Sequence, residues 1–598
     1  MQVLLTTSIA LATWVLFATP SLVAQESKTD NTEPQLTASN TDAGPAETEA
    51  TSPSVATTES TADQASTGSN VKFSWDTTFK YSNAFRLSGR NARLIDAARN
   101  PFNLNQDDGD RNFHGGLVSN RVDVLSEMDV QFGDFGIRGS MAAWGDSVYN
   151  QRTANNSPQS YNSLYSDYRH FPGGTRDLQF AYAELLDAFF FGKTRIGDRT
   201  LSFRVGKFAQ LWGEALFFGN NGIAGGMSPI DVTKLLAVPN TQFKELIRPV
   251  PQVSLQFEVT PKLSIGAYYQ FLWDELRLPP AGSYYSALDF MADGGERVFL
   301  GPPLVPGGGP AAMFRRPDLE PKDSGQFGVQ AKIHAGHGID LGFYAIQFHE
   351  KAPQPYLQPF APGDVNPVTG QVGNYYWVFP ENIKAYGMSA TKTMGVVNWA
   401  IEISGRTNQD LTSLAGAGPL PPSHGNPSYA VGDSIHGNLS ALATFGQNFL
   451  SKESTLLAEI AWNRLLSISH NPQALDPGVT RDGVGFRLLY TPTYRQVFSG
   501  LDLSIPVGFS FFPMGKSAVL YPFGPDKGGD FSVGVSTSYL DAWRFSLTYT
   551  QFYGPAGGAL IVDSFPAPHF TFKQSLADRN TISFSIFRTI GIRNKGSH

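Results

Sequence analysis

Four charged residues lie on one face of a predicted strand, and four apolar residues lie on its other face. The charged residues are Arg121, Asp123, Glu127 and Asp129, and they alternate with Val122, Val124, Met128 and Val130. A period of two places alternate residues on opposite faces of a strand. The charged face is either an element that selects for charge or a structural ladder of ion pairs, and the ladder is the simpler interpretation.

Charged residues on other predicted strands and in one long loop are also candidates for a polar interior face. If these strands cross a membrane, the charges must face a polar interior, because a charge facing lipid costs about 2–4 kcal/mol. These further interior candidates are Arg204, Glu214, Asp231, Lys234, Lys244, Glu402, Arg406 and Glu459.

An acidic run resembles part of a calcium-binding loop. It consists of Asp107, Asp108 and Asp110. An EF-hand loop also needs a closing glutamate, and Val118 stands at that position instead. We therefore predict a tight acidic turn, with calcium as the alternative, and we expect no cofactor.

Catalysis and nucleic-acid binding find little support. The chain has neither a G-x-S-x-G elbow nor an H-E-x-x-H motif, and the absence of cysteine excludes thiol catalysis and Cys-ligated zinc. A Ser-His-Asp triad assembled from distant segments stays open. A net charge of −7 argues against a nucleic-acid partner. We expect a protein that is not an enzyme.

Residues 71–592 consist of a long series of alternating segments. In one of the clearest, Val253, Leu255, Phe257 and Val259 alternate with Gln252, Ser254, Gln256 and Glu258. The polar positions are mostly Ser, Gly, Thr, Gln and Tyr, and only 16% of the chain is charged, against about 25% in soluble domains. The pattern predicts an all-β fold, a transmembrane antiparallel β-barrel with lipid outside and a polar lumen inside.

Short and long connections alternate along this region. The predicted short turns are Gly133–Phe135, Lys193–Arg199, Thr260–Leu263, Ala335–Gly338, Met394–Val396, Gly446–Lys452, Thr493–Gly500 and Leu540–Trp543. The long segments are roughly 88–120, 150–176, 213–250, 277–322, 352–377, 409–431, 468–482, 513–529 and 555–579. This rhythm predicts about 18 strands, within a range of 16 to 20. A barrel of that size is wide enough for an aqueous lumen.

The long segment 213–250 carries signals for a short helix. Ser228 at the N-cap, Pro229 at the first helical position and Asp231 in the first turn predict its start, and Pro239 predicts its end. Glycines flank this helix. We expect the loop either to fold into the lumen and narrow it or to form an external lid.

Both ends of the chain lie outside the predicted barrel. Residues 1–24 predict a signal peptide with an apolar core at Leu4–Phe17, a run short for the roughly 20 residues that a membrane helix needs. Residues 25–70 are acidic and rich in Ser and Thr, so they predict a disordered periplasmic tether. Residues 593–598 are predicted to form a C-terminal tail.

Several stretches resemble the family of proteins of unknown function DUF1302. They are Asn105–Phe113, Leu117–Asp123, Glu127–Asp129, Arg204–Lys207 running to Trp212–Glu214, Asn220–Ile223 running to Pro229–Val232, and Lys244–Glu245 with Pro249–Pro251. The resemblance covers about 71–590. It implies an outer-membrane barrel of a Gram-negative bacterium that takes part in the traffic of lipids or other hydrophobic compounds. It also implies a lipoprotein-like partner and an inner-membrane exporter, but it assigns no functional residues.

Three functions are consistent with the sequence. The leading expectation is a channel or transporter that passes a bulky, hydrophobic or aromatic small molecule or lipid across the outer membrane. Its partners would then be outer-membrane lipid and the solute. The alternatives are a non-transporting surface or scaffold barrel and a membrane-embedded hydrolase or acyltransferase.

Overall fold

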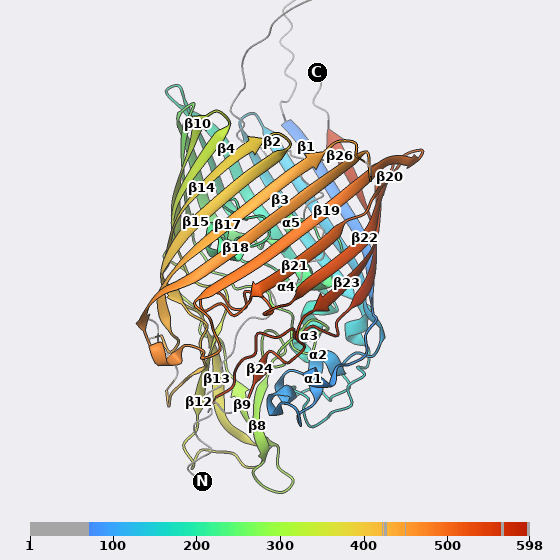
Figure 1. Ribbon diagram of the computed structural model, residues 1–598, viewed down its shortest axis with the longest axis vertical. Helices are drawn as coiled ribbons and strands as arrows, with labels where there is room; N and C mark the ends of the chain where they lie inside the picture. The colour runs from blue at the N-terminus through green and yellow to red at the C-terminus, as the bar shows by residue number, and fades with distance from the viewer. Residues whose placement is uncertain (1–70, 421–422, 424–426, 449, 564–566, 595–598) are drawn as a thin grey trace, which may run out of the picture.

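The strands close into a single antiparallel barrel. The computed structural model describes residues 71–594 except 421–422, 424–426, 449 and 564–566, so the predicted signal peptide and tether lie outside the described residues. Eighteen strand positions form the barrel wall, as the sequence predicts (Figure 1). The first and last strands pair with each other from Phe73 opposite Asn594 to Arg86 opposite Thr581, which closes the barrel.

Two short strands share one of the eighteen positions, because both pair with the same two neighbours. The wall consists of β1 (Val71–Arg86), β2 (Gly116–Phe132), β3 (Phe135–Asp146), β4 (Tyr182–Ile196), β5 (Arg199–Phe208), β6 (Val250–Thr260), β7 (Leu263–Gln270), β10 (Gln326–Gly336), β11 (Ile339–Phe348), β14 (Ile383–Met394), β15 (Val397–Asp410), β17 (Val431–Phe445), β18 (Glu453–His470), β19 (Asp482–Phe498), β20 (Leu501–Ser504) with β21 (Val507–Met514), β22 (Gly529–Tyr539), β23 (Trp543–Tyr553) and β26 (Thr581–Asn594). The last strand extends two residues beyond the predicted end of the barrel.

All eight predicted turns and all nine predicted long segments join wall strands. The turns lie at one end of the barrel, the turn end, and the long loops lie at the other, the loop end (Figure 1). In chain order the loops are 87–115, 147–181, 209–249, 271–325, 349–382, 411–430, 471–481, 515–528 and 554–580. We call them the first to the ninth loop.

The two faces of the wall differ as the alternation predicts. Val122 is 51% exposed on the outside of β2, whereas Arg121 and Asp123 on either side of it are 2% and 7% exposed inside. Near the turn end the outer face carries stacked aromatic rings, with the ring centroids of Phe135 and Phe190 6.0 Å apart. Such aromatic girdles are typical of the membrane interface of transmembrane barrels.

The loops contain small elements of their own. Strands outside the wall are β8 (Arg297–Pro303), β9 (Pro310–Arg315), β12 (Gln354–Pro359), β13 (Gln371–Val378) and β16 (Gly416–Ala417), which form one five-stranded sheet, and the pair β24 (Leu560–Ile561) and β25 (His569–Phe570). The helices are α1 (Ala92–Ile95), α2 (Asp108–Arg111), α3 (Gly173–Gln179), α4 (Val232–Ala237) and α5 (Phe243–Leu246), with 3-10 turns η1 (Pro101–Asn105), η2 (Ser147–Asn150), η3 (Gly219–Asn221), η4 (Ile223–Gly226) and η5 (Pro472–Ala474). Short helices thus occur in several loops, not only in the third. Among the described residues no helix is long and apolar enough to cross a membrane.

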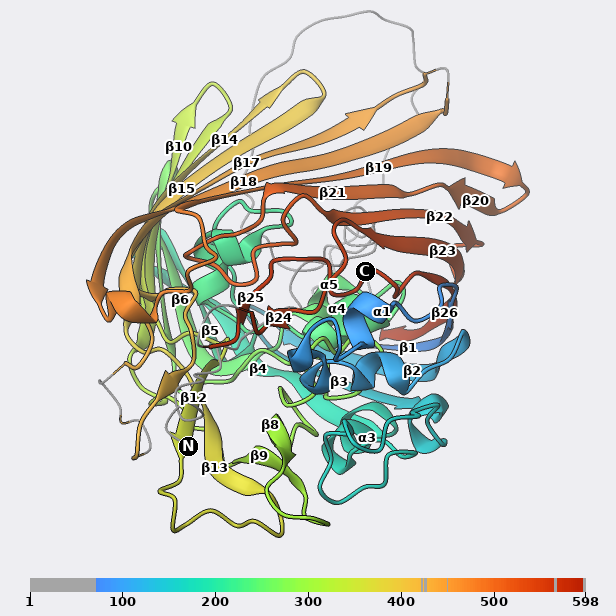
Figure 2. The same ribbon diagram turned by 60° about the horizontal axis from the view of Figure 1, so that its bottom comes forward.

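A hydrophobic core lies among the loops at the loop end. Phe290 of the fourth loop stacks on Trp377 of β13, with ring centroids 6.3 Å apart and both side chains at most 1% exposed. Side chains from the first, second and ninth loops complete this core, among them Phe113, Phe171 and Phe572. The loops therefore cover the mouth of the barrel as one packed layer (Figure 2).

Candidate functional site: the inward loop and the lumen

The third loop, residues 209–249, folds into the barrel and crosses the lumen, and we call it the inward loop. Its turns η3 and η4 contact β11, β14, β17 and β18 on one side. Toward another part of the wall, the side-chain amide of Asn240 donates a hydrogen bond of 2.6 Å to Ser585 of β26 and another to Ser546 of β23. Both of its helices lie within the ring of strands (Figure 2). Of the two predicted placements, the inward one is found.

The helix of the inward loop begins three residues later than the sequence favours. Asp231, not Ser228, is the N-cap of α4, and its carboxylate accepts a hydrogen bond of 2.7 Å from the backbone N–H of Lys234. A β-bridge between Ile230 and Ile247 keeps the preceding residues extended, which excludes an earlier start. The helix ends before Pro239, as predicted.

Glu402 on the lumen face of β15 binds the backbone of the inward loop. Its carboxylate accepts hydrogen bonds of 2.6 Å from the N–H groups of Glu214 and Ile223. The carboxylate approaches so closely because Gly213 and Gly222 lack side chains. A Cβ atom at either glycine would lie 2.4 Å or 2.6 Å from a Glu402 oxygen, and Gly213 also has φ +97°.

Glu459 and Arg406 bind the same stretch of loop from two strands, β18 and β15, that are separated by β17. Glu459 of β18 accepts hydrogen bonds of 2.5 Å and 2.9 Å from the N–H groups of Phe217 and Phe218. Arg406 of β15 donates to the carbonyls of Asn220 and Gly222 at 2.6 Å and 2.8 Å. The three predicted interior residues Glu402, Arg406 and Glu459 are therefore brought together, and they pair with loop backbone.

Asn221 is a contact residue of this loop that sequence reasoning missed. Its side-chain amide is 1% exposed and donates to the carbonyl of Gly437 and to the side chain of Asn438, at 3.2 Å and 2.9 Å. The Asn–Asn–Gly run could equally form a surface turn, so no local signal identifies this contact.

The second half of the inward loop joins a buried ion cluster. Lys234 lies 3.0 Å from Glu184 of β4, and Arg277 of the fourth loop bridges Glu184 at 2.6 Å and Asp231 at 2.8 Å. The ammonium of Lys234 also lies 4.3 Å from the ring centroid of Trp144. Burial alone would lower the pKa of Arg277, but Asp231 and Glu184 raise it above its usual value. Arg277 and Glu184 are members of this cluster that the sequence did not single out.

The charged face of β2 forms ion pairs, as the simpler of its two interpretations expects. Arg121 pairs with Asp123 at 2.7 Å, and Glu127 pairs with Arg138 of β3 at 3.2 Å. Glu127 also accepts a hydrogen bond of 2.6 Å from Lys244 of α5. Asp129 follows on the same lumen face and is half-buried.

The other predicted residues take separate positions. Arg204 is half-buried on the lumen face of β5, with its guanidinium carbon 5.8 Å from the ring centroid of Phe208. Glu214 is half-buried in the inward loop. Asp110 pairs with Arg86 at 2.6 Å, away from its predicted calcium partners Asp107 and Asp108.

Asp107 and Asp108 meet Asp289 of the fourth loop instead. All three side chains are at most 1% exposed. Burial raises the pKa of Asp107 to about 7, and it raises the pKa of Asp108 and of Asp289 well above the usual range. The acidic run is a single buried helical turn, α2.

Aromatic side chains line part of the lumen near the inward loop. Phe189 and Phe191 alternate with the outward-facing Phe190 on β4 and are half-buried, and the ring of Phe189 lies 5.4 Å from that of Phe208. Phe243 on α5 is 44% exposed. The lumen therefore offers apolar surface as well as charge.

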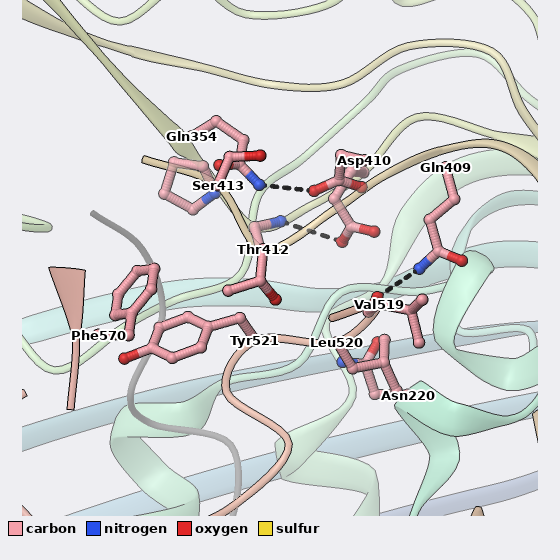
Figure 3. A pocket seen from close by; sticks show the side chains of 13 residues that line it. Asn220, Gln354, Gln409, Asp410, Thr412, Ser413, Val519, Leu520, Tyr521 and Phe570 are labelled. Carbon is pink, nitrogen blue, oxygen red and sulfur yellow. Dashed lines mark hydrogen bonds between the residues drawn. The ribbon is translucent and has the colours of Figure 1, made fainter. Parts of the chain in front are cut away.

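A narrow cleft that opens to solvent lies at the loop end and reaches Asn220 of the inward loop (Figure 3). Gln354 donates a hydrogen bond of 2.7 Å to Asp410 on one side of it. On the other side, the rings of Tyr521 and Phe570 lie with centroids 3.6 Å apart. The cleft thus combines polar and aromatic lining.

Comparisons with known proteins identify a family but no function. A family model described as "Protein of unknown function (DUF1302)" matches residues 45–589, and no curated protein matches the chain. The solved structure of Acinetobacter baumannii OccAB4 is 10% identical with a TM-score of 0.40, covering 87% of this chain and 98% of its own. Pseudomonas aeruginosa OccK5 (OpdH) is 8% identical with a TM-score of 0.38, covering 88% of this chain and 98% of its own. Pseudomonas aeruginosa OpdK with vanillate is 9% identical with a TM-score of 0.37, covering 88% of this chain and 99% of its own.

Proposed function

We propose, from the structure of its lumen, that this chain is an outer-membrane channel or transporter. The chain belongs to the DUF1302 family of proteins of unknown function, so family membership assigns no activity to it. The observation that carries this proposal is the inward loop, which crosses the lumen and is hydrogen-bonded to the wall on several sides. A loop that is hydrogen-bonded to the wall sets a fixed width of the lumen, whereas a freely moving loop does not define that width.

The solute of this channel is a bulky hydrophobic or aromatic small molecule or a lipid. Phe243 on α5 and the aromatic rings on β4 present apolar surface inside the barrel. The narrow cleft at the loop end places aromatic rings beside polar groups, so the route past it offers contacts to both the apolar body and a polar group of a solute. The turn end then faces the periplasm. A lipoprotein-like partner and an exporter of the inner membrane would receive the solute from this end or deliver it there.

Planar-bilayer recording of the purified barrel tests the width that the loop sets. Replacing residues 219–238 by a short Gly/Ser linker removes η3, η4 and α4, and we expect a higher conductance and passage of larger solutes. The matched control trims residues 362–368, an exposed tip of the fifth loop, and should leave conductance unchanged. If the folded 219–238 variant conducts like the wild type, the inward loop does not set the width.

Uptake of a polycyclic aromatic probe tests the class of solute. Phe243→Gln removes the exposed ring from α5, whereas Phe243→Leu keeps an apolar side chain of similar length. We expect slower uptake through Phe243→Gln than through Phe243→Leu, with equal passage of a small sugar. Equal uptake of the aromatic probe by both variants would contradict the hydrophobic solute, and a wild-type barrel that passes neither solute would favour a scaffold role.

A further inference from the structure

Three buried carboxylates from two distant loops converge at the loop end. Asp107 and Asp108 belong to the first loop and Asp289 belongs to the fourth, and one oxygen of each lies within 4.8 Å of the others. The three side chains are between 0% and 1% exposed. Buried charges of one sign are costly unless a counter-charge and hydrogen bonds compensate them.

The hydrogen bonds of the cluster satisfy only some of its oxygens. For Asp107, the Oδ2 atom accepts from Arg111 at 2.5 Å and from Ser160 at 3.1 Å. For Asp289, the Oδ2 atom accepts from the backbone N–H of Asp108 at 3.1 Å. The Oδ1 atoms of Asp107 and of Asp289 are buried without any hydrogen-bond partner. Two carboxylate oxygens are therefore available to a ligand inside the protein.

The second loop orients the carboxylate of Asp108. The side-chain amide of Asn155 donates to Oδ1 of Asp108 at 3.0 Å, and the backbone N–H of Asn162 donates to its Oδ2 at 2.9 Å. Supporting hydrogen bonds of this kind fix the direction of metal-binding carboxylates. Arg111 pairs with one of the three carboxylates. When all three carboxylates are ionised around a cation, and Arg111 pairs with Asp107, their net charge is −2, which matches a divalent ion.

We propose that Asp107, Asp108 and Asp289 bind one calcium ion, which joins the first loop to the fourth. All three donors are carboxylate oxygens, and calcium prefers such hard ligands, whereas structural zinc sites use His and Cys. Oxygens that lie within 4.8 Å of one another can all reach a single ion. Magnesium usually keeps several waters and binds one or two carboxylates, whereas calcium takes six to eight oxygen ligands, so a site with three protein carboxylates favours calcium. Water or backbone carbonyls would complete the coordination.

The ion would stabilise the layer of loops that covers the mouth of the barrel. The first and fourth loops both contribute to the core at the loop end, through Phe113 and Phe290. Binding of an ion to the folded state alone stabilises that state by mass action. This proposal does not depend on the channel function, because the same loops would be held together in a scaffold.

Isothermal titration of the full-length barrel in detergent, after removal of divalent ions by chelation, measures the binding. We expect one calcium site with a dissociation constant below about 1 mM, the weak end for extracellular calcium modules. Asp289→Asn and Asp108→Asn should each weaken binding at least about tenfold. Asp177→Asn, an exposed aspartate of the second loop, is the matched control and should bind like the wild type.

Protease protection of the loops gives a second readout on the same samples. Calcium should slow cleavage of the fourth loop in the wild type and in Asp177→Asn, and should not do so in Asp289→Asn. Heat-modifiable migration shows whether each variant has folded. A wild-type barrel that binds no calcium at about 1 mM overturns the proposal, and so does undiminished calcium affinity in both folded cluster variants. Equal affinity of the wild type for magnesium would overturn the choice of calcium.

Discussion

At the scale of single residues, two carboxylates in the lumen accept hydrogen bonds from backbone N–H groups. Glu402 and Glu459 each accept two such hydrogen bonds from the inward loop. Hydrogen bonds to charged groups contribute about 1.5–3 kcal/mol each, more than neutral ones. Because the donors are backbone groups, the contacts constrain the path of the loop.

Neighbouring residues on β6 test the assignment of the two faces. Leu255 is 46% exposed on the outer face in mid-strand, whereas Gln256 faces the lumen and donates a hydrogen bond to Ser264. We expect Leu255→Arg to lower the free energy of unfolding by about 2–4 kcal/mol, because it places a charge in lipid. Gln256→Arg should change it little. Urea unfolding of the barrel in lipid vesicles measures both, and equal losses would mean that the faces are assigned wrongly.

At the scale of elements, local patterns and long-range partners differ in what the sequence predicts. The period of two and the turn residues are local, so all eight turns and the lumen face of Glu402 follow from the sequence alone. The partner of Glu402 lies 188 residues away along the chain, and nothing in either segment specifies it. The same limit explains Asp289, which meets Asp108 from 181 residues away. The later start of α4 has this cause too, since the bridge from Ile230 to Ile247 competes with the helix.

The inward loop should loosen when Glu402 loses its carboxylate. Glu402→Ala leaves two N–H groups unpaired in the lumen, at a cost of about 1–3 kcal/mol each where water cannot replace the acceptor. We expect noisier single-channel currents and faster proteolysis within residues 214–223. Asn398→Ala is the matched control, because Asn398 is exposed on the same face of β15 nearer the turn end. Quiet currents in a folded Glu402→Ala barrel would show that the remaining contacts suffice to hold the loop.

At the scale of the whole molecule, two layers of contact define the fold. Strand pairing closes the wall, and it includes fourteen residue pairs between β1 and β26. The packed loops and the inward loop then fill much of what the wall encloses. The first layer follows from local sequence patterns, and the second depends on contacts between distant segments. Conditions or substitutions that loosen the loops should therefore leave the barrel wall intact.

The wall should also assemble without the segment that precedes it. Residues 27–68 have few apolar side chains and lie outside the described residues. The pairing of β1 begins only at Val71 with β2 and at Phe73 with β26. We expect deletion of 27–68, with the predicted signal retained, to leave heat-modifiable barrel in the outer-membrane fraction. The matched control is deletion of 27–86, which also removes β1. Its loss leaves β2 and β26 without the partner that closes the barrel, so this variant should fail to become heat-modifiable, because open edges are not tolerated in lipid. Failure of the shorter deletion as well would mean that the predicted tether takes part in assembly.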